Sequence, residues 1–317
     1  ISNCRPISLL EVHFKIMTRM LNRRLVGRLL DKNFFSPWQF GFLPGRACPD
    51  AFHILLGAVE DAKQYKEEIH VCLVDLTKAF DSISPESLQQ AYRHAGLSQK
   101  SCDILGAMDG TGKAKILTPW GPTESVDIKW GVRQGEVLSP AKFIIWINPW
   151  LEHIRLKHPH LGYNMHNPDG SVSDTSVTLL AFADDVAIVT KSAEEMQEII
   201  TSLCDFLRYH GVTLSAHGDP DKSKTIYTTN KKVPITEDGT PIPHKLRVQC
   251  YSRASAPDRQ HPAEHIDIIG LPPSHILTYL GGKISLDLDW TELRKKATPP
   301  VNMELAKLSR KRLGLSE

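Results

Sequence analysis

The stretch TLLAFADDVAIVT, residues 178–190, contains two apolar, β-rich runs separated by Ala183, Asp184 and Asp185. Apolar and β-branched residues favour strands, and Asp is a common turn residue. The stretch therefore predicts a hairpin with two adjacent acids at its tip. A solvated turn can carry the same pair, so the surrounding sequence decides what these acids do.

A third acid ends another apolar run. Residues 71–76 predict a short strand that bears Asp75. Carboxylates at the end of buried strands cost free energy unless a cation compensates them. If the two strands lie side by side, Asp75 and Asp184 come within a few ångströms, and such a cluster repels itself until Mg²⁺ binds. In-line phosphoryl transfer uses such carboxylates to hold two metal ions about 3.5–4 Å apart.

The rest of the chain alternates helices with short strands. Residues 11–30 predict an amphipathic helix with Val12, Ile16 and Met20 on its apolar stripe and an Arg stripe beside it. Ser84 and Pro85 predict a helix start, as N-cap and first helical residue. The other expected elements are helices at 140–157 and 193–210, hairpins at 114–130 and 277–285, and an irregular surface insertion at about 231–265. This order predicts an α+β domain built on a small antiparallel sheet.

Composition bounds the function without deciding it. The 317 residues carry a net charge of +2 and 41% apolar residues, which allows a sizeable core. At that charge, a nucleic-acid partner requires the basic residues to gather on one groove. The six cysteines are scattered without a Cys-x-x-Cys pair, as expected for reduced thiols of an intracellular protein. No apolar run reaches the ~18 residues of a membrane span. The opening Ile1-Ser2-Asn3 lacks Met, which suggests a piece of a longer polypeptide.

Several stretches occur in an order that resembles a known family. VCLVDLTKAFD at 71–81, GVRQGEVLSP at 131–140 and FADD at 182–185 resemble motifs A, B and C of reverse transcriptases, in the form typical of non-LTR (LINE-type) retrotransposons. NCRPISLL at 3–10 and QFGFLPGR at 39–46 resemble the two finger motifs of that family. Lys222-Ser223 resembles motif D, and YLGG at 279–282 resembles motif E, the primer grip. The resemblance covers nearly the whole chain.

The resemblance implies an RNA-directed DNA polymerase with a right-hand architecture of fingers, palm and thumb. The reverse transcriptase domain would span 1–290, with an antiparallel palm sheet. Its parts would be fingers at about 1–70 and in part of 86–135, a palm at about 71–85 and 136–230, the surface insertion at 231–265, a primer-grip hairpin at 277–287 and a truncated thumb from 288 to 317.

Residue roles carry over to matching positions. By resemblance, the catalytic and metal-binding carboxylates are Asp75, Asp184 and Asp185, a further catalytic residue that protonates pyrophosphate is Lys222, and the nucleotide site contains Arg5, Phe80, Gln134 and Gly135. Phe80 would exclude a 2′-hydroxyl, and the guanidinium fork of Arg5 would grip the triphosphate. Gly135 would allow a close approach of backbone. Without the resemblance each has a plain alternative: a core aromatic for Phe80, a surface residue for Arg5 or Lys222, and a turn for Gln134-Gly135.

Two positions depart from the family pattern. Members usually carry Asn-x-x-Lys at motif D, whereas residues 215–222 read SAHGDPDK, a longer run without the Asn. Lys142 puts a charge where the family often has an apolar residue. All three acids are present, so the sequence gives no sign of a dead site.

Other functions stay open at this point. An RNA-templated RNA polymerase shares the palm, but typically has Gly before the Asp pair and a second acid near the position of Phe80, whereas this chain has Ala183. A catalytically inactive or domesticated retroelement remnant that binds RNA is another reading, against which the intact acids argue. The GVRQG and GFLPGR forms favour the LINE type over a group II intron or telomerase relative.

The resemblance also implies cofactors and partners. Two Mg²⁺ ions would be the cofactors. The partners would be an RNA template, a DNA primer or nicked target DNA, dNTPs, and an endonuclease domain of the same polyprotein, without a membrane. The expected location is intracellular, in the nucleus, with a cytoplasmic ribonucleoprotein.

Overall fold

The computed structural model describes residues 8–109, 112–128, 131–133, 135–236, 238, 242–250 and 264–289. Arg5, Gln134 and nearly all of the expected thumb segment lie outside these residues. The described helices are α1 (Val12–Asp31), α2 (Cys48–Tyr65), α3 (Ala79–Ser82), α4 (Pro85–His94), α5 (Gln99–Met108), α6 (Ser139–Lys157) and α7 (Ala193–His210). The described strands are β1 (His70–Val74), β2 (Gly112–Ala114), β3 (Leu117–Thr118), β4 (Gly121–Pro122), β5 (Val126–Ile128), β6 (Tyr163–His166), β7 (Val172–Val177), β8 (Leu179–Phe182), β9 (Asp185–Thr190), β10 (Ile226–Thr229), β11 (Lys245–Cys250), β12 (Glu264–Ile269), β13 (Leu277–Tyr279) and β14 (Gly282–Ile284).

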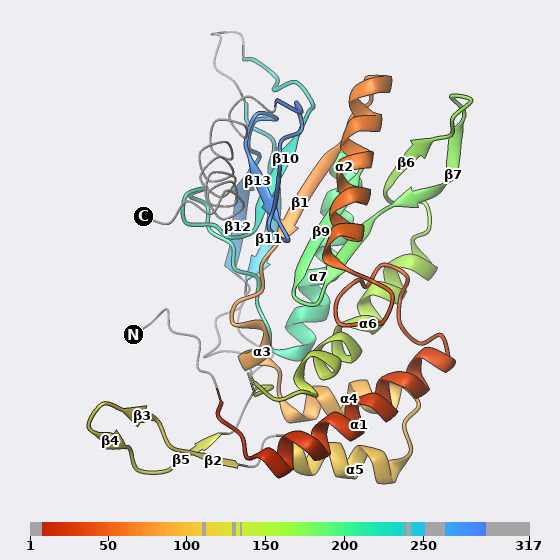
Figure 1. Ribbon diagram of the computed structural model, residues 1–317. Helices are drawn as coiled ribbons and strands as arrows, with labels where there is room; N and C mark the ends of the chain where they lie inside the picture. The colour runs from red at the N-terminus through yellow and green to blue at the C-terminus, as the bar shows by residue number, and fades with distance from the viewer. Residues whose placement is uncertain are drawn as a thin grey trace, which may run out of the picture.

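A four-stranded antiparallel sheet in the order β10-β1-β9-β8 organises the molecule (Figure 1). β1 pairs with β9 up to Val74 and Val186, and β8 pairs with β9 up to Phe182 and Asp185. The strand predicted at 71–76 and the hairpin predicted at 178–190 therefore lie side by side. The α+β class with an antiparallel sheet is confirmed.

Both faces of this sheet are covered, which explains why β1 is buried at every residue. Cys72 and Val74 belong to a core that includes α6 and α7, whereas Val71 and Leu73 belong to a second core that includes α2, β13 and β14. Because side chains alternate between the faces of a strand, a strand between two covering layers is apolar throughout.

Both edges of the sheet also have partners. Gln39 forms a parallel bridge with Ala181 of β8 at one edge, and Leu271 forms a parallel bridge with Thr228 of β10 at the other. Backbone groups that would otherwise face solvent are thereby paired along part of each edge strand.

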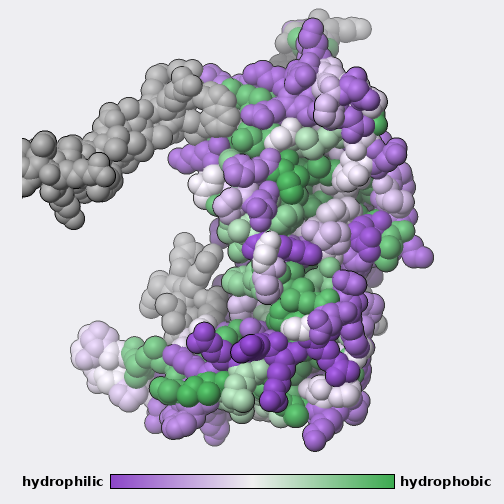
Figure 2. Space-filling model, turned by 45° about the vertical axis from the view of Figure 1, so that its right-hand side comes forward, coloured by the Kyte–Doolittle hydropathy of each residue, from purple (hydrophilic) through white to green (hydrophobic). Residues whose placement is uncertain are grey.

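The helices α1, α4 and α5 lie below the sheet (Figure 1), and α4 packs against both α5 and α6. Ser84 caps α4 as predicted, because its side-chain oxygen accepts from the Ser87 N–H at 3.1 Å and Pro85 follows as the first helical residue. In space-filling view the described residues are hollowed on one side, between the β-rich part and the helical part (Figure 2). No helix among the described residues has both the length and the apolar character needed to cross a membrane.

The apolar stripe expected on α1 is not buried. Val12, Ile16 and Met20 are exposed, and the residues of α1 that are buried are Thr18, Val26 and Leu29. The helix itself is present, but the period did not identify the face that packs against the rest of the protein.

The prediction of an irregular surface insertion at about 231–265 was wrong for part of that range. β11 and β12 pair as an antiparallel hairpin and pack on α7. Leu246, Val248 and Cys250 are buried and alternate with more exposed neighbours. The alternating pattern is only six residues long, so it did not stand out beside a segment rich in Pro, Asp and His.

Candidate active site

Three acids lie at one end of the central sheet. Asp75 follows the last residue of β1, and Asp185 is the first residue of β9. Because Val74 pairs with Val186, extending the register by one residue sets Asp75 opposite Asp185. Opposite residues of an antiparallel pair have Cα atoms about 4.5–5.5 Å apart. The two strand ends therefore bring these acids together, with Asp184 in the turn beside them.

The backbone of Asp75 is fixed by two neighbouring segments. The Ser215 N–H donates to the Asp75 carbonyl at 2.8 Å. The Asp75 N–H donates to the Thr225 hydroxyl at 3.3 Å, and this hydroxyl lies 3.4 Å from the Asp75 carbonyl, to which it donates. Asp75 and Asp184 are half-buried and Asp185 is exposed. A rigid backbone thus presents carboxylates that a solute can still reach.

The turn that carries Asp184 is strained. Phe182 pairs with Asp185, which leaves Ala183 and Asp184 as a two-residue loop. Ala183 has a φ of +54°, and this left-handed conformation costs a residue with a Cβ roughly 1–2 kcal/mol. Two-residue turns with positive φ at the first central position normally have Gly there. Contacts around the turn must offset this cost.

Residues 34–46, here named the clamp loop, lie against this hairpin. The Phe40 N–H donates to the Ala181 carbonyl at 2.7 Å, and the Ala181 N–H donates to the Trp38 carbonyl at 2.9 Å. The Phe42 ring contacts the Phe182 ring, with centroids 5.5 Å apart. The clamp loop is therefore joined to β8 by backbone and by side chains.

Gln39 connects the clamp loop to the strained turn. Its side chain is fully buried, and its Oε1 accepts from the Gly41 N–H at 2.8 Å and from the Ala183 N–H at 3.0 Å. Gln39 was not among the expected site residues. The only signal in the sequence was its place in the QFGFLPGR stretch, which resembles a finger motif.

Phe80 lies where motif A meets motif B. The Val132 N–H donates to the Phe80 carbonyl at 2.7 Å, and the Gly131 N–H donates to the Ile83 carbonyl at 2.9 Å. The Phe80 ring is half-buried and stacks on Phe143 with centroids 4.8 Å apart. One side of the ring is thus held by the core while part of it remains accessible.

Gly135 lies against another backbone segment of the same chain, and its expected role in the nucleotide site stays a prediction. Its φ is +104°, and a Cβ at this position would lie 2.7 Å from the carbonyl oxygen of Ser8. Ser8 belongs to the stretch that resembles the first finger motif. Gly at 135 thereby lets motif B lie directly against that segment.

The unexpected charge at Lys142 is compensated inside the protein. Its Nζ lies 2.7 Å from Asp109 Oδ1 and 3.1 Å from Glu136 Oε1, and all three side chains are at most 3% exposed. Glu136 follows Gly135 directly. The departure at Lys142 is therefore part of a buried network beside motif B.

The β13–β14 hairpin, which carries the motif E resemblance, lies near the acids. The Tyr279 hydroxyl donates to the Leu180 carbonyl at 2.7 Å. Burial raises the pKa of Tyr279, and the negative charge of Asp185 raises it further. The ring of Phe52 fills the space that a side chain at Gly282 would need.

Lys222 is a surface residue in this structure. Its side chain is 67% exposed and its Nζ lies 3.0 Å from Asp219 Oδ2. The nearby Lys224 is connected to Asp75 through backbone, since its N–H donates to the Ser215 carbonyl at 3.2 Å and the Ser215 N–H donates to Asp75. The role expected for Lys222 thus stays a prediction.

The three acids have the ligand type that suits a hard divalent cation, because Mg²⁺ prefers carboxylate oxygens. Their side chains do not converge to the spacing of a ligand cluster. Their backbones share one end of the central sheet. The donor set therefore fits a divalent metal ion through its chemistry and its place at the strand ends.

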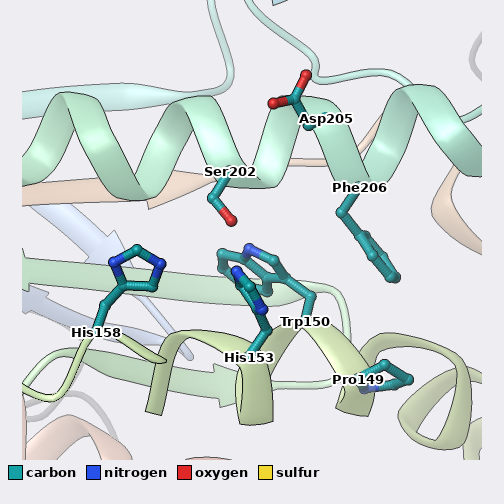
Figure 3. A pocket seen from close by; sticks show the side chains of 7 residues that line it. All are labelled: Pro149, Trp150, His153, His158, Ser202, Asp205 and Phe206. Carbon is teal, nitrogen blue, oxygen red and sulfur yellow. The ribbon is translucent and has the colours of Figure 1, made fainter. Parts of the chain in front are cut away.

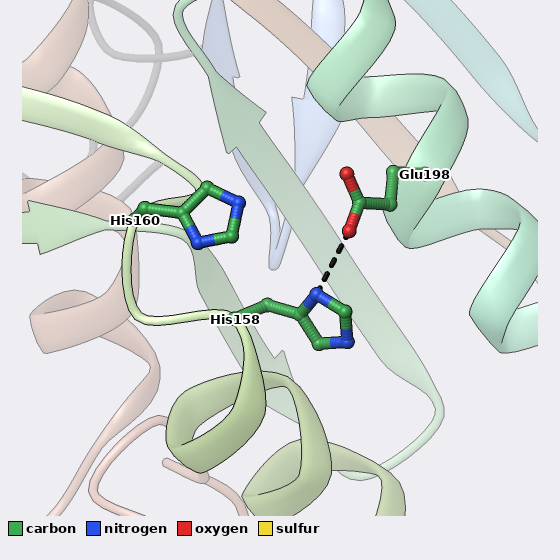
Figure 4. Close-up of side chains that lie close together, drawn as sticks. All are labelled: His158, His160 and Glu198. Carbon is green, nitrogen blue, oxygen red and sulfur yellow. Dashed lines mark ion pairs between the residues drawn. The ribbon is translucent and has the colours of Figure 1, made fainter.

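Among the described residues, the group with metal-ligand spacing is His158, His160 and Glu198, whose ligand atoms lie within 4.8 Å of one another (Figure 4). It lies on the loop after α6 and on α7. His158 Nδ1 is 2.8 Å from Glu198 Oε1, and His160 and Glu198 are exposed. A hollow of about 470 Å³ lies beside it, lined by Pro149, Trp150, His153, His158, Ser202, Asp205 and Phe206 (Figure 3). None of the three strand-end acids lines this hollow.

The family model for reverse transcriptase (RNA-dependent DNA polymerase) matches residues 1–282. The chain belongs to the reverse transcriptase family. The resemblance to the non-LTR branch is confirmed as well, because the curated relatives of this reverse transcriptase domain come from such elements. A polyprotein from the type-2 retrotransposable element R2DM of Drosophila melanogaster is 28% identical over 67% of this chain and 19% of its own length. The RNA-directed DNA polymerase from the mobile element jockey of Drosophila funebris is 24% identical over 68% of this chain and 23% of its own length.

The matched stretch covers less than a quarter of the length of each of these two relatives. Among solved structures, an apo telomerase from Candida tropicalis truncated from its C-terminal domain is similar, with a TM-score of 0.48 and 13% identity over 68% of this chain and 41% of that one. The family assignment depends on the sequence match over residues 1–282.

Proposed function

We propose that this chain is the catalytic core of the RNA-directed DNA polymerase of a non-LTR retrotransposon. It adds dNMP units to a primer 3′-hydroxyl on an RNA template and releases pyrophosphate. The observation that carries the proposal is the meeting of Asp75 with the Asp184–Asp185 turn at the end of the paired strands β1 and β9. The family match at residues 1–282 gives this cluster its reaction class.

Asp75, Asp184 and Asp185 would hold two divalent ions, with Asp75 and Asp184 as the direct ligands of both. When bound, such ions activate the attacking hydroxyl and neutralise the triphosphate charge. Because the same three carboxylates would hold both ions, they would bring the primer end and the nucleotide to one place. Their fixed backbones matter because phosphoryl transfer depends on positioning of the reacting atoms.

The nucleotide would lie between motif A and motif B. Phe80 would close the space under the sugar at C2′, where a ribose hydroxyl needs room. Gly135 would belong to the same nucleotide site, and Gln134 and Arg5 would contact base and triphosphate. Lys222 would protonate pyrophosphate. The fingers, palm and thumb ranges given above are part of the same proposal.

The expected partners are an RNA template, a DNA primer end or nicked target DNA, and an endonuclease domain of the same polyprotein. Two curated relatives are polyproteins much longer than this chain, which supports further domains. Contacts to template and primer would be mainly to phosphates, so binding should weaken as salt rises. A nuclear location with a cytoplasmic ribonucleoprotein follows from that role.

The test is primer extension on a defined RNA template with Mg²⁺, supplied with dNTPs or rNTPs. The combined change Asp184→Asn and Asp185→Asn should abolish synthesis while RNA affinity is kept or raised. A matched control, Asp169→Asn with Asp174→Asn on the β6–β7 hairpin, removes the same charge from exposed acids and should keep synthesis.

Each result has a defined meaning. DNA synthesis that requires the Asp184–Asp185 turn supports the proposal. Incorporation of rNTPs instead would make the chain an RNA polymerase. RNA binding by a folded chain without synthesis would point to an inactive remnant.

A further inference from the structure

We infer that Gln39 is a positioning residue: by holding the Ala183 amide, it keeps the hairpin turn in the conformation that places Asp184 and Asp185 at the strand ends beside Asp75. This inference rests on the proposed function, because it concerns the same acids. It goes beyond the three acids, because it gives the clamp loop the role of fixing the turn that carries two of them.

The first support is the strain at Ala183. Its φ of +54° is a conformation that a residue with a Cβ keeps only where the surroundings enforce it. The Ala183 N–H is the group nearest to the strained bond, and it donates to Gln39 Oε1 at 3.0 Å. Asp184 is the next residue. The backbone conformation at Ala183 therefore sets the direction in which the Asp184 side chain leaves the turn.

The second support is how Gln39 is used. Its Oε1 accepts two backbone N–H groups, from Gly41 and Ala183, which fixes the amide orientation. Its Nε2 is buried without a hydrogen-bond partner within the described part of the chain. An unpaired buried donor disfavours folding. All hydrogen bonds that the described residues offer to this side chain therefore go to its Oε1 acceptor.

The third support is the fit of the loop against the turn. A Cβ at Gly41 would lie 2.7 Å from the Ala183 nitrogen, so the backbones approach as closely as a glycine allows. The clamp loop is itself anchored elsewhere. Asn148 of α6, which is 1% exposed, accepts from the Ser36 N–H and donates to the Phe34 carbonyl, both at 2.8 Å. Arg46 donates to the carbonyls of Ser36 and Gln39.

These contacts connect the turn to a rigid base. Asn148 fixes the start of the clamp loop on α6, and Arg46 closes the loop around the Gln39 carbonyl. Gln39 in turn holds Ala183, because its Oε1 accepts from the Ala183 N–H. A change at Gln39 should therefore alter the geometry of the acids, whereas loss of an apolar core side chain that does not contact the clamp loop should alter only the stability of the fold.

The test compares Gln39→Met, which keeps the length of the side chain but removes the acceptor, with Leu105→Ala, which removes a buried apolar side chain of α5. Three quantities are measured on each folded protein: affinity for Mn²⁺ alone by electron paramagnetic resonance, half-saturating Mg²⁺ in primer extension, and the urea midpoint. We expect Gln39→Met to weaken Mn²⁺ binding and raise half-saturating Mg²⁺ by about tenfold, as the loss of a group that orients metal ligands does. Leu105→Ala should lower the urea midpoint at least as much as Gln39→Met does, because it leaves a cavity in the core, and it should leave both metal values within twofold.

A second variant separates positioning from general damage. Ala183→Gly added to Gln39→Met should recover much of the lost Mn²⁺ affinity, because Gly adopts positive φ without support. Mn²⁺ affinity of Gln39→Met within twofold of the unmodified chain would overturn the inference, and so would no recovery with Ala183→Gly.

The outcomes also separate this inference from the proposed function. If the unmodified chain binds Mn²⁺ through Asp184 but adds no nucleotide, the proposed function fails and the Mn²⁺ comparison still decides the role of Gln39. If the unmodified chain binds no Mn²⁺ in the millimolar range, both fail.

Discussion

Lys142 and Asp109 form a buried ion pair, with Nζ 2.7 Å from Oδ1 and side chains that are 2% and 3% exposed. Glu136 shares the same ammonium group at 3.1 Å. The Tyr92 hydroxyl donates to Asp109 Oδ2 at 2.8 Å. Burial raises the pKa of Tyr92, and the Asp109 carboxylate raises it further, so the phenol remains a donor. The network joins α4, the end of α5, motif B and α6.

Lys142→Met should destabilise the fold by about 3–5 kcal/mol, because it leaves two buried carboxylates without their cation. Adding Asp109→Asn and Glu136→Gln should recover most of the loss, since no uncompensated charge then remains. Urea unfolding measures both. Lys191→Met is the control: Lys191 is 52% exposed and pairs with Glu195 at 3.4 Å, so its loss should cost at most about 0.5 kcal/mol. Equal effects of Lys142→Met and Lys191→Met would contradict the network.

Phe80→Ala should relax the rejection of rNTPs. The ring is half-buried and stacked on Phe143, so its removal opens more than the space that a sugar hydroxyl needs. We expect the dNTP-to-rNTP ratio of kcat/KM to fall roughly 10- to 100-fold, the range that a small group in a pocket contributes. Phe206→Ala is the control, because Phe206 packs on Trp146 in the same core. It should leave the dNTP-to-rNTP ratio unchanged. Unchanged sugar discrimination in Phe80→Ala would remove Phe80 from the gate role.

Lys222→Met tests the motif D expectation. If Lys222 donates a proton to pyrophosphate, single-nucleotide addition should slow by about 100-fold, as loss of a general acid does. Stability should barely change, since the side chain is 67% exposed. Lys224→Met is the matched comparison at the next lysine. A larger loss in Lys224→Met than in Lys222→Met would move the role to Lys224.

His210 should make the fold less stable in mild acid. Burial lowers the pKa of His210 from 6.5 to about 4, and the ring lies among Ser87, Trp146, Phe206 and Tyr209. Between these pH values the unfolded chain binds more protons than the folded one. The contribution of His210 is therefore complete above pH 6.5 and declines as pH falls toward 4.

The partial exposure of His210 reduces this effect to about 1 kcal/mol between pH 7 and pH 5. His210→Gln should flatten the pH dependence of the unfolding free energy by that amount. His94→Gln, at an exposed position of α4, should leave it unchanged. A His210→Gln profile that overlays the unmodified one would contradict the pKa direction.

Local signals predicted the parts of the fold that local chemistry determines. The hairpin at 178–190, the cap at Ser84 and the helix at 193–210 have clear periods or capping residues, and all three are present. α2 was not predicted, although Leu55 and Val59 are buried at helical spacing. Its remaining buried residues, Ala51, Ala58 and Ala62, are small and give a weak pattern.

The sequence motifs predicted the acids of the site but not the residues that contact them from distant parts of the chain. Asp75 and the Asp184–Asp185 turn were placed together from strand ends and order. Gln39 lies 144 positions from Ala183 in the chain, and no local pattern records such a contact. Lys142 read as an anomaly because its two partners come from other elements.

The covered edges of the central sheet bear on where this chain can be cut. The Leu271 N–H donates to the Tyr227 carbonyl at 2.9 Å, and the Thr228 hydroxyl donates to the Leu271 carbonyl at 3.1 Å. A shortened protein that ends before residue 271 would keep all three acids but expose the outer side of β10. Bare edge strands recruit other strands, so such a fragment should self-associate in solution, and an expression boundary beyond the β13–β14 hairpin is the safer choice.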